Sequence, residues 1–174
     1  YYNMIKGLIN WHYSLIWTAR YIKSIVYGGL DGIITTFAIV AGVAGASLNS
    51  SIVLILGFAN LIADGISMAA GDYLSTKAEI ESRKNNLLWK LKKIIFNDKK
   101  SPLKSAIITF ISFVAFGFIP LIAYVLDYFG FNLGNLFIFS IVLTGLALFL
   151  LGSLKSFITN KNWFKSGIET LIIG

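Results

Sequence analysis

Long stretches without a single Asp, Glu, Lys, Arg or His decide what this chain can fold into. They cover residues 32–63, 105–126 and 128–154. An α-helix needs about 20 apolar residues to cross the hydrocarbon core of a bilayer. The polar run at residues 47–51 splits the first stretch into two candidate spans. We therefore expect an all-α, polytopic membrane protein.

Five membrane spans are predicted, at about residues 24–46, 51–76, 104–126, 133–154 and 163–174. The fifth has too few residues to cross a bilayer, so we expect it to be a truncated span. Composition supports this class, because hydrophobic residues make up 56% of the 174 residues and charged residues only 13%. An average soluble domain has roughly 25% charged residues. The sequence contains no cysteine, which excludes disulfides, zinc thiolate clusters and thiolate catalysis.

The basic residues are confined to one side of the predicted topology. All 15 of them lie within residues 1–23, 77–104 and 155–165. The connections at residues 47–50 and 127–132 contain none. Because basic residues collect in the cytoplasmic loops of membrane proteins, this asymmetry predicts a cytoplasmic N-terminus. It also accounts for the net charge of +7 without a nucleic-acid partner.

Two flanking segments have an amphipathic rather than a membrane-spanning pattern. Residues 1–22 mix apolar and aromatic side chains with a few basic ones, which predicts an interfacial helix before a transmembrane domain at residues 23–174. The basic loop at residues 77–103 contains a second such stretch at residues 87–95. We interpret it as an interfacial helix with snorkelling lysines. A calmodulin-type partner helix is the alternative.

Acidic residues inside the predicted spans are the strongest functional signal, because a charge at membrane depth is costly. Asp31 lies in the first span, within a glycine-rich segment. The second span carries, at four-residue steps, Asn60, Asp64, Met68 and Asp72. On a helix this spacing places the four side chains along one slowly drifting face. The second span therefore presents carboxylates, an amide and a thioether on one stripe.

Such a stripe supplies the ligands of a divalent metal site. Carboxylate oxygens alone suit Mg²⁺ or Ca²⁺, and a thioether shifts the preference towards later transition metals such as Fe²⁺. A carboxylate must lose its proton to bind a metal, so the same groups can exchange protons for metal ions. Candidate relay residues are Thr35, Glu79 and Glu169. Two structural alternatives stay open: Met68 can fill a gap in the core, and Asp72 can solvate a helix end.

Two blocks of the sequence carry a resemblance to a known family. One is residues 26–38, which begin Val-Tyr-Gly-Gly-Leu-Asp-Gly, and the other is residues 57–75, which include Met-Ala-Ala-Gly-Asp-Tyr-Leu-Ser. Residues 101–102, residues 117–121 and the start of the fifth span fit the same pattern. Over about residues 20–174 the chain resembles the vacuolar iron transporters.

This resemblance implies a five-helix homodimer that exports Fe²⁺, and often Mn²⁺, from the cytoplasm in exchange for protons. It implies no enzymatic activity and no cofactor, because the metal is the cargo. The aspartate and the methionine that line the path in the family correspond to Asp31 and Met68. Asn60 stands where well-studied members have a glutamate, and Asp64 is the candidate to replace it. The basic loop lacks the glutamate-rich metal-binding domain of several members, so the chain resembles a short form of the family.

Two other functions are weighed against transport. A non-transporting membrane scaffold would use the intramembrane charges for helix packing or oligomerisation only. An intramembrane aspartyl protease could use two aspartates on neighbouring helices, but its Gly-x-Gly-Asp motif is absent and Met68 has no role in it. We expect divalent metal ions, protons and the lipid bilayer as partners. The expected location is a prokaryotic cell membrane or, failing that, a vacuolar-type membrane.

Overall fold

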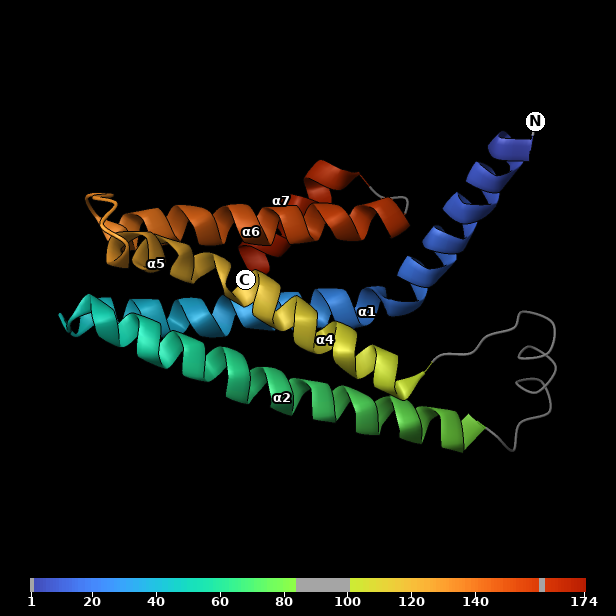
Figure 1. Ribbon diagram of the computed structural model, residues 1–174, viewed down its shortest axis with the longest axis horizontal. Coiled ribbons are helices and arrows are strands. Elements are labelled where there is room, and N and C mark those ends of the chain that lie inside the picture. Colours follow the sequence, from blue (N-terminus) through green and yellow to red (C-terminus); the bar gives the residue numbers. More distant parts are fainter. Residues whose placement is uncertain (1, 84–100, 160–161) are drawn as a thin grey trace.

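The computed structural model describes residues 2–83, 101–159 and 162–174, and its regular elements in these parts are all helices (Figure 1). In chain order the α-helices are α1 (Tyr2–Gly45), α2 (Ser50–Arg83), α4 (Pro102–Gly117), α5 (Ile122–Tyr128), α6 (Leu136–Thr159) and α7 (Trp163–Ile173). A short 3₁₀ helix, η1 (Ile119–Leu121), joins α4 to α5. The predicted all-α fold class is confirmed.

Four helical segments are long and apolar enough to cross a membrane. They are Tyr21–Gly45, Ser50–Ser82, Pro102–Tyr128 and Leu136–Ser156. These segments match the first four predicted spans, although the second runs further towards the basic loop. The 11-residue helix α7 packs against α6, where the fifth span begins. The polytopic architecture predicted from the uncharged stretches is therefore confirmed.

The third span is broken, which the sequence analysis did not predict. Helix α4 ends at Gly117, η1 makes one turn, and α5 continues to Tyr128. Pro120 lies in this turn, and proline has no N–H to donate and fixes its own φ angle, so a regular helix cannot continue through it. The hydroxyl of Ser140 on α6 donates to the carbonyl oxygen of Pro120 over 2.8 Å, inside the bundle. The break is thus stabilised by a neighbouring helix.

The amphipathic segment at residues 1–22 is continuous with the first span. Helix α1 runs from Tyr2 to Gly45 without interruption, and Figure 1 shows its first part leaning away from the bundle. Its position at the membrane interface stays a prediction. The amphipathic stretch predicted at residues 87–95 lies outside the described residues.

Helix α1 is the centre of the bundle, because α2, α4 and α6 all pack against it. Glycines permit its close approach to α4. A Cβ atom added to Gly28 would lie 2.5 Å from the backbone oxygen of Thr109, and one added to Gly32 would meet the backbone oxygen of Phe113. Around this contact, Val40 and Phe113 are fully buried. The first span is therefore held against α4 by backbone contacts that any side chain would prevent.

One end of the bundle carries the basic residues of the loops. Figure 1 shows the end of α2, the start of α4 and the end of α6 on the same side. These positions hold Lys77, Lys104 and Lys155. We call this side the basic end, and the positive-inside rule predicts that it faces the cytoplasm.

Candidate metal path

Asp31 of α1 and Asp64 of α2 are the two predicted site carboxylates that remain available to a ligand. The two carboxylates interact electrostatically across the neighbouring helices, and both side chains are half-buried at the surface of the bundle. Within the described residues, neither carboxylate accepts a hydrogen bond. Asp31 lies ten residues beyond Tyr21, which is about 15 Å along a helix and near the middle of a hydrocarbon core about 30 Å thick.

A short hydrogen-bond chain connects Asn60 to the first span. The amide nitrogen of Asn60 donates to Thr35 Oγ1 over 3.2 Å, and Thr35 Oγ1 donates to the backbone oxygen of Asp31 over 2.9 Å. Thr35 therefore fixes the position of Asn60 rather than contacting the Asp31 carboxylate. This bond also orients the Asn60 amide towards Thr35 and leaves its carbonyl oxygen, within the described residues, free to accept or to ligate.

Met68 lies one turn beyond Asp64, and its surroundings keep both interpretations of it open. The side chain is half-buried and packs against the apolar cluster that contains Leu61 and Phe113. This packing is what a gap-filling methionine would show. Its place one turn from Asp64, on the same drifting face, is what a metal ligand would need.

Asp72 has quite different surroundings from Asp31 and Asp64. Its Oδ2 accepts hydrogen bonds from Ser24 on α1 over 2.9 Å, and from Ser105 and Thr109 on α4 over 2.8 and 2.6 Å. Its Oδ1 accepts one from Thr76 over 3.3 Å. These bonds connect α1, α2 and α4 through one carboxylate, both oxygens of which accept hydrogen bonds. The geometry describes an interhelical anchor, and the expected metal role of Asp72 stays a prediction.

The hydroxyl partners of Asp72 were missed in the sequence analysis. Ser105 and Thr109 are fully buried, and Ser24 is nearly so. A signal for them does exist, because Ser105 and Thr109 stand four residues apart in an otherwise apolar span and so share one helix face. Ser112 continues that row and donates to the backbone oxygen of Ile25 over 2.6 Å.

The two glutamates proposed as relay residues lie away from this path. Glu79 is exposed on α2, fifteen residues beyond Asp64, or about 22 Å along the helix. Glu169 on α7 forms an ion pair with Lys155 on α6 at 3.6 Å. Among the described residues, no group of three or more His, Cys, Asp or Glu side chains could hold a metal ion. The structure brings together Asp31, Asp64, Asn60 and Thr35, with Met68 one turn further along.

The fold and these residues define a class: a polytopic helical membrane protein with acidic residues at membrane depth, where such residues mark ion pathways. Sequence comparison gives the family. The sequence profile described as the VIT family matches residues 22–94 and 89–174, which is nearly the whole chain. The chain belongs to the VIT family.

Curated relatives agree with this assignment. The chain is 31% identical to "Vacuolar iron transporter" of Toxoplasma gondii, with 86% of this chain and 68% of the relative covered. It is 31% identical to the protein of the same name from Plasmodium falciparum, covering 80% and 72%. It is 29% identical to "Vacuolar iron transporter 1" of Arabidopsis thaliana, covering 97% and 87%. These relatives are eukaryotic and give no support to the expected prokaryotic cell membrane.

The comparisons also bear on the length of the basic loop. The alignment with the Toxoplasma gondii relative runs over 205 positions although it covers 86% of this 174-residue chain, so the relative has segments that this chain lacks. The two parts of the family match meet at residues 89–94, within the basic loop. Both findings support the predicted short form.

Proposed function

We propose that this membrane protein transports Fe²⁺, and also Mn²⁺, out of the cytoplasm in exchange for protons, as a homodimer. The observation that carries the proposal is the Asp31–Asp64 pair, two carboxylates on adjacent helices at membrane depth that have no hydrogen-bond donor in the described part of the chain. The family and the relatives named vacuolar iron transporter support a metal ion as the cargo. The family is one of transporters, not of enzymes, and no observation favours the intramembrane protease.

The pair suits coupled exchange because the negative charge of the two carboxylates is neutralised in both states of the site, by a metal ion in one and by protons in the other. A carboxylate binds a metal ion only when it is deprotonated, so binding of Fe²⁺ at Asp31 and Asp64 releases the protons they hold. When the metal leaves on the other side, protons take its place. Two carboxylates with an amide and a thioether give weak, mixed ligation, which lets a carried ion leave again.

A two-fold partner would cover the exposed side of this path. On α1, Tyr27, Ala38 and Gly42 lie on the same face as Asp31 and are exposed. On α2, small exposed residues flank Asp64 at four-residue steps: Ala63, Ser67 and Gly71. Small residues let membrane helices approach closely, and a half-exposed carboxylate facing lipid is costly. A second copy related by a two-fold axis would shield both carboxylates and double the number of ligands.

Flux measurements on the purified protein test the proposal. The protein is reconstituted into liposomes with an acidic lumen, and external Fe²⁺ is added while lumenal iron and lumenal pH are recorded together. Coupled exchange predicts iron uptake with a simultaneous rise in lumenal pH, and faster uptake with a steeper proton gradient. Uptake no faster than in protein-free liposomes would support a scaffold instead. Iron uptake without any proton movement would overturn the exchange mechanism.

A further inference from the structure

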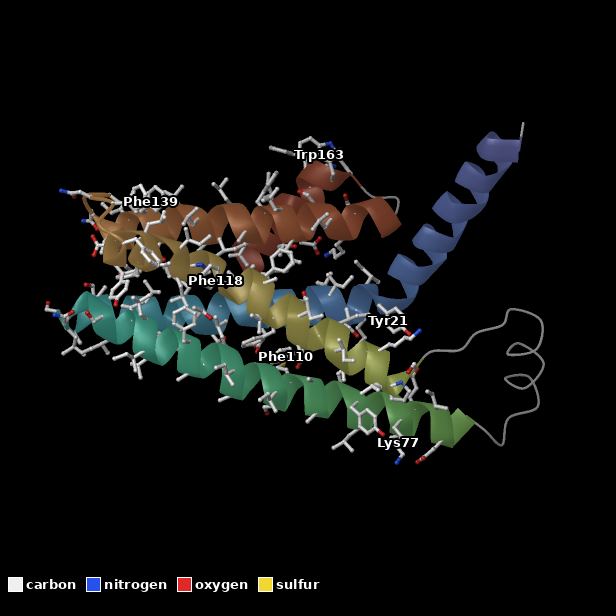
Figure 2. All side chains as sticks on the ribbon, viewed as in Figure 1. Tyr21, Lys77, Phe110, Phe118, Phe139 and Trp163 are labelled. Carbon is white, nitrogen blue, oxygen red and sulfur yellow. The ribbon has the colours of Figure 1, made fainter. Side chains whose placement is uncertain are left out.

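A groove between α2 and α4 has an apolar lining throughout and a volume of about 560 Å³. Its floor is hollow because the residues there are small: Ala69 and Ala70 of α2 and Ala106 of α4. Larger side chains form its walls, among them Tyr73 on α2 and Phe110 on α4. Figure 2 shows Phe110 between the two helices. Ile66, Leu74 and Ile107 of its lining are exposed, so the groove opens on the outer surface of the bundle.

Two cationic side chains stand where this groove reaches the basic end. Lys77 lies one turn beyond Tyr73 on α2, at the end of the helix where Figure 2 labels it. Lys104 lies in the first turn of α4, next to the groove residue Leu103. Both side chains are exposed, and neither has an ion-pair partner in the part of the chain that the structure describes. An apolar groove with two unpaired cations at its mouth matches an amphiphile with an anionic head.

The length of the groove matches one leaflet of a bilayer. Its residues on α2 extend from Ile66 to Leu74, which is about 12 Å along a helix. Half of a hydrocarbon core about 30 Å thick is about 15 Å. We propose that this groove binds one anionic phospholipid, with the phosphate at Lys77 and Lys104 and an acyl chain against the alanine floor. The leaflet at the basic end is the cytoplasmic one by the positive-inside rule, and anionic lipids are concentrated there.

A second groove on the same protein provides an internal comparison. It lies between α2 and α5 at the opposite end of the bundle, has a volume of about 500 Å³, and is lined almost entirely by apolar atoms, with Phe58 and Phe129 in its walls. The only charged residue in the connections at that end is Asp127. The two grooves are similar in size and apolarity and differ in charge, so only the first should prefer an anionic head group.

The proposed lipid groove borders the face assigned to a second copy of the chain. Ala70 and Leu74 of the groove lie seven residues beyond Ala63 and Ser67 of that face, within about 20° around the helix. The experiment must therefore distinguish a lipid from a second copy as the occupant. The lipid proposal does not depend on metal transport.

Native mass spectrometry of the full chain tests the head-group preference. The protein is purified from membranes of phosphatidylcholine and phosphatidylglycerol in equal amounts, and the retained lipid is identified. We expect one phosphatidylglycerol per protomer. The double variant Lys77→Gln/Lys104→Gln should lower the preference for phosphatidylglycerol by about fivefold for each lysine, on the order of 25-fold for the pair. The control Lys23→Gln/Lys165→Gln removes the same charge elsewhere at the basic end and should keep the parental preference.

A groove-filling pair of variants tests the position of the acyl chain. Ala70→Leu narrows the first groove from an exposed position and should abolish retention of the lipid, whereas Ser51→Leu narrows the second groove and should leave retention unchanged. The proposal is overturned if the lysine variant keeps the parental lipid ratio or if the control pair changes it equally. It is overturned as well if Ala70→Leu retains the lipid, or if it splits an oligomer without affecting lipid, which would make a second copy the occupant.

Discussion

Two aspartates on the same drifting face of α2 have opposite surroundings. Asp64 accepts no hydrogen bond within the described residues, whereas Asp72, two turns later, accepts hydrogen bonds from four hydroxyl groups. A polar side chain held by many donors contributes to stability, and one without donors is free to bind a ligand. The roles of the two residues should therefore separate experimentally.

Removal of the Asp72 carboxylate should destabilise the bundle. Asp72→Ala leaves the buried hydroxyls of Ser24, Ser105 and Thr109 without their acceptor. Ser24 and Ser105, whose Oγ atoms lie 2.8 Å apart, can bond to each other, and backbone carbonyls of the same helix offer further acceptors. We therefore expect the free energy of unfolding to fall by about 2–4 kcal/mol. Asp64→Ala is the matched control and should change it by less than about 1 kcal/mol. Denaturant unfolding in detergent micelles measures both, and equal losses would contradict the anchor role of Asp72.

The role of Met68 can be tested by metal preference. Met68→Leu conserves volume and apolarity, so packing alone predicts a stability loss below about 1.5 kcal/mol. It removes the only sulfur from the stripe and should lower Fe²⁺ transport more than Mn²⁺ transport, since Mn²⁺ accepts oxygen ligands readily. The ratio of initial Fe²⁺ and Mn²⁺ uptake rates in liposomes, at matched protein content, reports the effect. If both rates and their ratio are unchanged, Met68 belongs to the core.

The sequence identified the acids but could not assign them. A step of four residues on an α-helix turns by about 40° beyond a full turn, so three steps from Asn60 to Asp72 add up to about 120°. As a result, the first residue of the stripe faces α1, where Asn60 donates to Thr35. The last residue, Asp72, accepts from Thr109 on α4. The positions of α1 and α4 relative to α2 decide which carboxylate accepts hydrogen bonds, and a single span does not contain that information.

At the scale of elements, the spans were predicted from the sequence, whereas the break in the third span and the close contact of α1 with α4 were not. Length and apolarity alone set where a helix can cross a membrane, so the uncharged stretches located four spans to within a few residues at most ends. The break between α4 and α5 follows from Pro120, whose signal is in the sequence. The close contact of α1 with α4 could not be predicted from the glycines of α1 alone. It becomes visible only when the backbone that packs against those glycines is known.

That close contact makes a prediction for the glycines. A Cβ at Gly32 would meet the backbone of Phe113, so Gly32→Ala must push α1 away from α4 and should cost about 1–3 kcal/mol of unfolding free energy. Gly145→Ala on α6 is the control, since its Cβ would meet nothing within 4 Å and alanine favours a helix. Thermal unfolding in detergent should show a lower midpoint for the first variant and an unchanged or higher one for the second. Equal midpoints would mean that the α1–α4 contact is looser than described.

At the scale of the whole molecule, the exposed face around Asp31 predicts how protomers associate. A Cβ at Gly42 meets nothing within 4 Å in a single chain, so Gly42→Leu leaves the protomer intact. If the partner packs on this face, the larger side chain should shift the protein from dimer to monomer. Light scattering in detergent measures the mass, with Gly145→Leu as the control outside the face. A Gly42→Leu protein that stays dimeric and transports at the parental rate would exclude this face as the interface.

The proposed exchange of metal for protons depends most directly on Asp31 as the group that carries both. The decisive measurement records lumenal iron and lumenal pH together in liposomes containing Asp31→Asn, beside the parent and the exposed acid variant Asp127→Asn. Asparagine keeps the shape of the side chain but cannot exchange a proton for a metal ion. We predict that Asp31→Asn inserts and dimerises normally yet loses both fluxes, while Asp127→Asn behaves as the parent. Parental, proton-coupled iron uptake by Asp31→Asn would contradict the account.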